Sequence, residues 1–228
     1  MSPIRNRHAM RQPEVHLLQQ GSLLRREDGN ILDAHSSICL IRSGQGLIVV
    51  DTGAPEDALA VTEALWRLHL APVDIDIVVN THGHWDHVGC NHLFPRAVFM
   101  AHLLEPEIGS RIPVSAGSCL VRSAFTIGPG IELHPTPGHS CGSLSVVVKD
   151  AISSFGGSGA DVVIAGDALP LAANYEKRVP PSIHWDRDHC VESINQIVAM
   201  AEWVVPGHDA PFRVRRTGYG EKKSDEGK

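Results

Sequence analysis

The chain has 228 residues, of which 43% are hydrophobic and 20% are charged, and its formal net charge is −6. This composition is typical of a soluble globular protein, and the length is sufficient to bury a core without disulfides. The acidic balance argues against nucleic acid as a partner, because phosphate-binding proteins carry an excess of Lys and Arg.

The five cysteines are scattered through the sequence without a C-x-x-C pair, a pattern typical of reduced thiols. The first residues lack the apolar run of a signal peptide, and no stretch approaches the ~18 apolar residues of a membrane span. We therefore expect a cytoplasmic protein with no membrane partner.

Short β-branched runs, each followed by Gly, Pro or Asp, recur along the chain. Nine of them are predicted to be strands: Val15–Leu18, Ile38–Ile41, Leu47–Val50, Ile75–Val79, Ala97–Met100, Ile131–Leu133, Leu144–Val148, Val162–Ala165 and Trp203–Val205. Helical periods predict one helix from Pro55 to about Leu70 and a second that starts after Asp186 and ends near Glu202. Many strands separated by turns favour two packed sheets with helices outside.

Three further segments are expected to connect these elements. Glu105–Ser118 is predicted to be a loop and Ser153–Gly159 a hairpin tip, because both are rich in turn-forming residues. Leu169–Trp185 has two adjacent prolines and no clear period, which predicts a long surface loop near a functional site. We expect residues 1–216 to form a single domain and the charged residues 217–228 a disordered tail.

The densest group of chemically active side chains is the run Thr81–His87, with the sequence THGHWDH, which follows a predicted strand. His82 and His84 are two residues apart in an extended chain and so lie on the same side. Asp86 and His87 would project from the first turn of a helix that begins near His84. Imidazole and carboxylate together suit zinc, iron or manganese better than calcium or magnesium.

Four more candidate residues stand where a predicted strand ends. His139, Asp167 and His208 are each preceded by a glycine, which lets the backbone bend and approach closely. Asp51 follows the strand Leu47–Val50 and precedes Thr52 and Gly53 in a D-T-G motif. Strand ends at one sheet edge could bring these side chains together.

The D-T-G motif, the H-x-H-x-D-H cluster, a lone His, an Asp and a final His, in this order, resemble the metallo-β-lactamase superfamily. The resemblance extends from about Ser37 to Val214. It implies an α/β (α+β) fold, a four-layer αββα sandwich, with a metal site along one edge of the two sheets.

The resemblance also implies a ligand set for two divalent metal ions, zinc by preference, with iron or manganese as alternatives. The expected ligands, with Asp167 bridging both ions, are His82, His84 and His139 for one and Asp86, His87 and His208 for the other. Asp51 would support the site without binding metal, and Asp86 and Asp167 are the predicted catalytic residues. A water held between two such cations loses a proton near neutral pH, because metal binding lowers its pKa towards ~7 from ~16.

We predict from this set a binuclear metal-dependent hydrolase of a small ester, lactone or thioester. Asp167 argues against a true β-lactamase, which does not keep this aspartate. The short segment after His208 lacks the helical domain of glyoxalase II, and the chain lacks the inserted domain of the RNA-processing nucleases. Tyr175 and His184, in the long loop after Asp167, are predicted to contact a small-molecule substrate.

Two alternatives remain open. The run Val204–Val214 is similar to the metallo-β-lactamase domain-containing protein 1 group, which has been linked to RNA cleavage, and this makes a phosphodiesterase or ribonuclease the second hypothesis. Persulfide dioxygenases of the same superfamily use one iron, which is the third. The acidic balance argues against nucleic acid as a partner, and a homodimer stays an open alternative.

Overall fold

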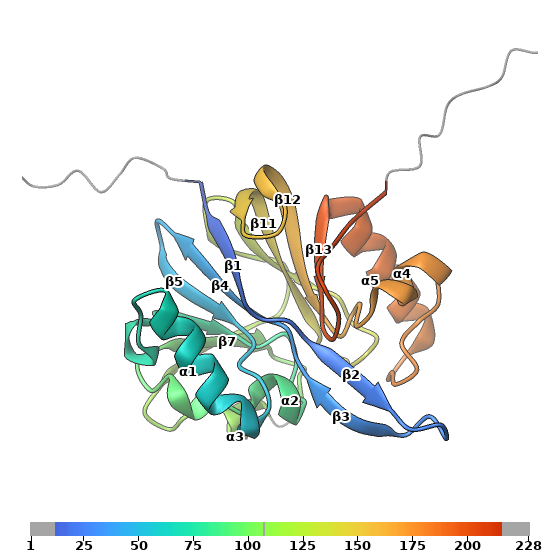
Figure 1. Ribbon diagram of the computed structural model, residues 1–228, viewed down its shortest axis with the longest axis horizontal. Helices are drawn as coiled ribbons and strands as arrows, with labels where there is room; N and C mark the ends of the chain where they lie inside the picture. The colour runs from blue at the N-terminus through green and yellow to red at the C-terminus, as the bar shows by residue number, and fades with distance from the viewer. Residues whose placement is uncertain (1–11, 107, 216–228) are drawn as a thin grey trace, which may run out of the picture.

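The computed structural model describes residues 12–106 and 108–215, which form two groups of strands with helices on their outer sides (Figure 1). The strands of the first half are β1 (Glu14–Gln19), β4 (Ile38–Ser43), β5 (Gly46–Val50), β6 (Ile77–Val79), β7 (Val98–His102) and β8 (Gly117–Val121). Those of the second half are β9 (Phe125–Gly128), β10 (Ile131–Pro135), β11 (Leu144–Ser153), β12 (Gly157–Gly166), β13 (Trp203–Pro206) and β14 (Phe212–Arg213). A short parallel pairing between β1 and β11 joins the two halves.

Two longer helices cover the outer faces of these halves (Figure 1). α1 (Ala58–Arg67), preceded by the 3-10 turn Pro55–Asp57, packs on the first half, and α5 (Arg187–Met200) packs on the second. The short elements are α2 (Trp85–Val88), α3 (Ile108–Arg111), α4 (Ala172–Lys177) and the 3-10 turns Pro72–Asp74 and Asn91–Leu93. The separate hairpin of β2 (Ser22–Arg25) and β3 (Ile31–His35) projects from the body of the molecule.

Successive side chains of a strand face opposite sides of its sheet, and this alternation produces the layers of the fold. In β4, Cys39 and Ile41 face a core shared by both halves, whereas Leu40 faces Val61 and Leu65 of α1. In β12, alternate residues face the shared core and α5 in the same way. Side chains of a strand point to opposite faces with a period of two, so three apolar cores separate four layers. The predicted αββα sandwich is therefore confirmed.

All nine predicted strands are present, and both predicted helices form. The first helix ends at Arg67 and not at Leu70, because His69 adopts a left-handed backbone conformation with a φ of 57°. The predicted hairpin tip Ser153–Gly159 is confirmed, with β11 and β12 extending further into it than expected.

Other connections contain more structure than the sequence indicated. The predicted loop Glu105–Ser118 contains α3 and the start of β8, and Leu169–Trp185 contains α4. β2, β3, β8, β9 and β14 were not predicted, because they are short and largely exposed and lack a long β-branched run. The predicted tail, residues 217–228, lies outside the described residues. Within residues 12–106 and 108–215, no helix has the length and apolar character needed to cross a membrane.

Candidate metal centre

The predicted metal ligands follow strands whose ends meet at one edge of the sandwich. β5 and β6 are parallel neighbours, so the chain leaves both at the same end and places Asp51 and His82 there. β12 and β13 are also parallel, and they bring Asp167 and His208 together. A backbone hydrogen bond of 2.7 Å from the first residue of β11 to the loop after β6 joins the two halves. The topology thus gathers side chains that are far apart in sequence.

Three histidines form the first donor group. His84 Nδ1 lies 3.1 Å from His82 Nε2 and 2.9 Å from His139 Nε2. His82 and His139 are buried, whereas His84 is exposed. Three nitrogen atoms therefore converge on one point that remains open on one side.

Asp86, His87 and His208 form the second donor group, and Asp167 lies between the two groups. Asp86 Oδ2 is 3.4 Å from His208 Nε2 and 3.9 Å from His87 Nε2. Asp167 Oδ1 lies 3.4 Å from His87 Nε2 and 3.2 Å from His208 Nε2. Its other oxygen, Oδ2, lies 3.5 Å from His139 Nε2. One carboxylate thus offers an oxygen to each group.

Backbone carbonyls fix the rings of two of these histidines. His139 Nδ1 lies 2.9 Å from Ile183 O, and His208 Nδ1 lies 2.9 Å from His35 O. A carbonyl can only accept a hydrogen bond, so both Nδ1 atoms carry the proton and donate it. In the neutral ring, each Nε2 then carries the lone pair that can bind a metal ion.

Asp51 holds Thr81, which directly precedes His82, and the ring of His87 in α2. Its carboxylate accepts hydrogen bonds from Thr81 N (2.8 Å) and Thr81 Oγ1 (2.7 Å). It also accepts one from His87 Nδ1 (2.8 Å), which leaves His87 Nε2 free to face Asp167. Asp51 adopts a φ of 57°, a conformation that costs a residue with a side chain about 1–3 kcal/mol. These contacts place Asp51 beside the two donor groups, where it holds Thr81 and the ring of His87.

The local charges fit this arrangement. Burial, with the neighbouring rings of His87 and His139, holds the pKa of His82 well below its usual value, so its ring is neutral. Burial alone would lower the pKa of His87, but the carboxylates of Asp51 and Asp167 outweigh it and raise that pKa. Burial also opposes ionisation of Asp167, yet His208 and His87 hold its pKa well below the usual range. The carboxylates thus favour positive charge at these nitrogens, which a proton or a metal cation can supply.

The donor groups fit metal ions on two further observations. His87 Nε2 and Asp167 Oδ1 are buried and have no hydrogen-bond partner among the described residues. Such buried polar atoms are costly unless a ligand satisfies them. Zinc at about 2.0–2.1 Å from each nitrogen of a tetrahedron separates its ligands by about 3.3 Å, close to the spacing found here. The two groups can therefore hold a pair of ions that share Asp167.

Gly207 shows how closely the backbone approaches this centre. A methyl group at Gly207 would collide with Asp167 Oδ1 and approach the Gly166 backbone. We expect Gly207→Ala to displace the carboxylate and weaken metal binding about tenfold or more, because overpacking costs about 1–3 kcal/mol. Metal content after dialysis measures this effect. Gly109→Ala, at a position with open space around it, is the control, and equal metal retention in both variants would contradict the prediction.

A cavity of about 770 Å³ opens over the two groups. His84, Asp86, His139, Asp167 and His208 contribute to its floor. The hairpin β2–β3 supplies one wall, and the segment from Pro170 to Ile183 supplies another. Concave sites with apolar walls and a few convergent polar groups are typical of small-molecule binding.

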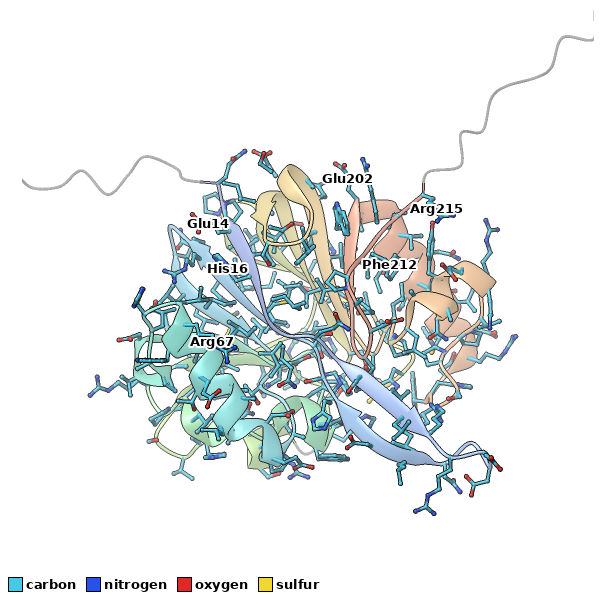
Figure 2. All side chains as sticks on the ribbon, in the orientation of Figure 1. Glu14, His16, Arg67, Glu202, Phe212 and Arg215 are labelled. Atoms are coloured by element: carbon cyan, nitrogen blue, oxygen red, sulfur yellow. The ribbon has the colours of Figure 1, made fainter. Side chains whose placement is uncertain are left out.

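Tyr175 and His184, which were predicted to contact substrate, are not among the residues that line this cavity. Tyr175 lies on α4, stacks on Phe212 with ring centroids 5.3 Å apart, and donates a hydrogen bond to Arg215 O (3.2 Å). Figure 2 shows Phe212 and Arg215 on the last described segment, away from the hairpin in this view. His184 is exposed, and its Nδ1 bonds to Pro181 O (2.7 Å). The unpredicted helix α4 turns Tyr175 away from the metal centre.

Other residues of the segment Leu169–Trp185 line the cavity instead. Asn174, Val179 and Ile183 line the cavity, and Ile183 also accepts the hydrogen bond from His139. This carbonyl contact could not be predicted from the sequence, since any residue type could provide it. One sequence feature could have predicted the β2–β3 hairpin that forms a wall of the cavity. It is the turn-forming run from Asp28 to Asn30, which lies between two short runs with apolar residues.

Comparisons with known proteins agree with this geometry. Residues 33–208 match the metallo-β-lactamase superfamily. A Methanocaldococcus jannaschii protein named as a probable metallo-hydrolase is 34% identical over 195 residues, covering 86% of both chains. Mouse metallo-β-lactamase domain-containing protein 1 is 36% identical over 186 residues, covering 81% of this chain and 67% of its own. An N-acyl homoserine lactonase of Bacillus cereus is 25% identical, covering 79% of this chain and 84% of its own.

A solved structure shows the same fold. It is a Bacillus thuringiensis AiiA variant with N-decanoyl-L-homoserine bound at its active site, superposed with a TM-score of 0.68. Its sequence is 21% identical, and the match covers 88% of this chain and 94% of that one. With the sandwich, the order of motifs and the two donor groups, these findings show that the chain belongs to the metallo-β-lactamase superfamily of metal-dependent hydrolases.

Proposed function

We propose that this protein is a binuclear hydrolase that cleaves a small ester, lactone or thioester with two divalent ions, zinc by preference. One observation carries the proposal: Asp167 divides its two oxygens between two complete donor groups at the floor of a cavity. A site for one ion would not require the second group. The residues of both groups would hold two ions, which would supply an activated water and polarise the electrophilic oxygen of the substrate.

The chain's own residues prepare this reaction in two ways. The carbonyl and carboxylate partners of His87, His139 and His208 hold their rings with Nε2 directed inward, so little reorganisation accompanies the reaction. Asp86 is 7% exposed and lines the cavity, where the carboxylate oxygen that does not face His208 and His87 could accept a proton released during substrate cleavage. Asp86 and Asp167 are therefore the proposed catalytic residues.

The cavity walls favour a substrate with an apolar portion. Leu23, Ile31 and Leu32 line it from the hairpin, and Val179 and Ile183 line it from the opposite segment. Burial of apolar surface contributes roughly 25 cal/mol per Å². These walls suit the acyl part of an ester, lactone or thioester, and the lactonase relative supports a substrate of this class.

A phosphodiester substrate is the second candidate, suggested by the relation to metallo-β-lactamase domain-containing protein 1. The cavity supports it less well. Among the described residues that line it, Arg25 is the one Lys or Arg, and its guanidinium already donates to Gly29 O (2.8 Å) and Ser182 Oγ (2.9 Å). Phosphate recognition normally uses several cationic side chains.

The test combines metal quantitation with a substrate panel. We expect the purified protein to hold two ions per chain and to hydrolyse lactones, thioesters or aryl esters. A chelator should remove this activity and added Zn²⁺ restore it, and a mock purification from cells that lack the protein serves as the control for contaminating enzymes. A higher kcat/KM for bis(4-nitrophenyl) phosphate than for every carbonyl substrate would favour the phosphodiesterase. One iron per chain with oxygen consumption would favour a dioxygenase.

A further inference from the structure

We propose that Glu105 is a positioning residue for the first metal ion, because its carboxylate ties together the two loops that carry His82, His84 and His139. Glu105 lies three residues beyond the end of β7 and is 5% exposed. The inference rests on the proposed metal-dependent function, and it concerns a residue outside the donor groups.

Each oxygen of Glu105 holds a different loop. Oε1 accepts a hydrogen bond of 2.9 Å from Gly83 N, and Gly83 is the residue between His82 and His84. Oε2 accepts one of 2.5 Å from Ser140 Oγ, and Ser140 directly follows His139. Because the first loop belongs to one half of the sandwich and the second to the other, this carboxylate bridges the halves at the first donor group.

The surroundings keep the carboxylate in this position. Ser143 Oγ lies 2.8 Å from Ser140 Oγ and accepts from Ser140 N at 3.1 Å, so the serine that contacts Glu105 is itself fixed. Gly142 packs against the Glu105 backbone so closely that a methyl group at Gly142 would collide with it. Cys141 Sγ donates to Leu104 O at 3.0 Å. Residues 140–142 therefore contact residues 104–105 at several points, which holds the Glu105 carboxylate in place.

The second donor group depends on other contacts. His87 is held by Asp51, and His208 is held by the carbonyl of His35. Loss of the Glu105 carboxylate should therefore loosen the first group selectively. A general loss of protein stability would instead lower the affinity for both ions to the same extent.

The experiment is a titration of metal-free protein with Zn²⁺ against a chromophoric chelator, which measures two dissociation constants. We expect Glu105→Ala to raise the dissociation constant for one of the two Zn²⁺ ions about ten- to a hundredfold, the range typical for residues that orient metal ligands. Glu105→Gln should recover most of this affinity, because its amide can accept from Gly83 N and donate to Ser140 Oγ. Glu14→Ala, at the start of β1 (Figure 2), is the control and should bind as the unmodified protein does.

Double variants assign the effect to one ion. His208→Ala removes a ligand of the second group, so that one Zn²⁺ ion remains bound at the first group. Adding Glu105→Ala should then lower the affinity for this remaining ion. His84→Ala removes a ligand of the first group, and there the same addition should change nothing. Should Glu105→Ala fail to fold, Ser140→Ala replaces it, since that change releases only the contact on the His139 side and should weaken the same equivalent.

Two results would overturn the inference: unchanged Zn²⁺ affinities in these variants, or a loss that follows the second group. The proposed function fails separately. A protein that binds two Zn²⁺ ions, loses one with Glu105→Ala and hydrolyses no carbonyl substrate would disprove the hydrolase assignment and support the role of Glu105.

Discussion

Replacing Asp167 with Ala is expected to lower kcat/KM for the best substrate at least about a thousandfold and to reduce the metal content. The reason is that both donor groups share this carboxylate, with Oδ1 facing His87 and His208 and Oδ2 facing His139. Metal ions contribute several kcal/mol to transition-state stabilisation, and each 1.4 kcal/mol lost is about tenfold in rate. Steady-state kinetics and metal analysis on the same preparations measure both effects.

Asp167→Asn separates charge from geometry. The amide keeps one oxygen of similar position but loses the negative charge, so we expect lower metal content than in the unmodified protein and activity closer to that of Asp167→Ala. Asp74→Ala, in an exposed turn where the carboxylate accepts a hydrogen bond from Ala71 N, is the matched control. Near-normal turnover by Asp167→Ala would remove the two-ion mechanism.

Replacing Asp51 with Ala is expected to weaken metal retention about ten- to a hundredfold without deleting a ligand. Its carboxylate accepts three hydrogen bonds, two from Thr81 and one from His87. The variant leaves the Nδ1 proton of His87 without a partner, so the ring loses both its orientation and its preferred tautomer. Equilibrium dialysis against Zn²⁺ gives the affinity.

Asp51→Asn refines this prediction, because asparagine tolerates the left-handed backbone found at this position better than alanine does. Its oxygen can still accept from the Thr81 backbone, but its NH₂ group cannot accept the proton of His87 Nδ1. We therefore expect better thermal stability than in Asp51→Ala with a similar loss of metal. Full metal retention in both variants would show that His87 does not need this partner.

These variants also distinguish three ways of disturbing one centre. Asp167→Ala removes a shared ligand, Asp51→Ala removes the partner of one ligand, and Glu105→Ala loosens the loops that carry three others. The variants should differ in the ion whose binding they weaken. Asp167→Ala should weaken the binding of both ions, Asp51→Ala that of the second ion, and Glu105→Ala that of the first. Metal titration can therefore resolve contributions that a loss of activity alone would merge.

The strand pattern and the order of ligands could be predicted from the sequence, because both depend on local information. Buried strands repeat β-branched residues, and ligand residues occur as fixed types at strand ends, as in the run from His82 to His87. Polar, exposed elements such as β8 and α4 carry weaker local signals, since little apolar surface marks their faces. This is why the long segment after Asp167 was predicted to be an irregular loop.

Residue types and strand patterns were enough to identify the side chains that could bind metal and the strands that precede them. The contacts that hold those side chains became visible only in the folded protein: the carbonyls of His35 and Ile183, the carboxylate of Glu105, and the position of Tyr175 outside the cavity. Such contacts join segments that are distant in the chain. A backbone carbonyl carries no residue-type signal, and the direction of a side chain depends on the packing of the element that bears it.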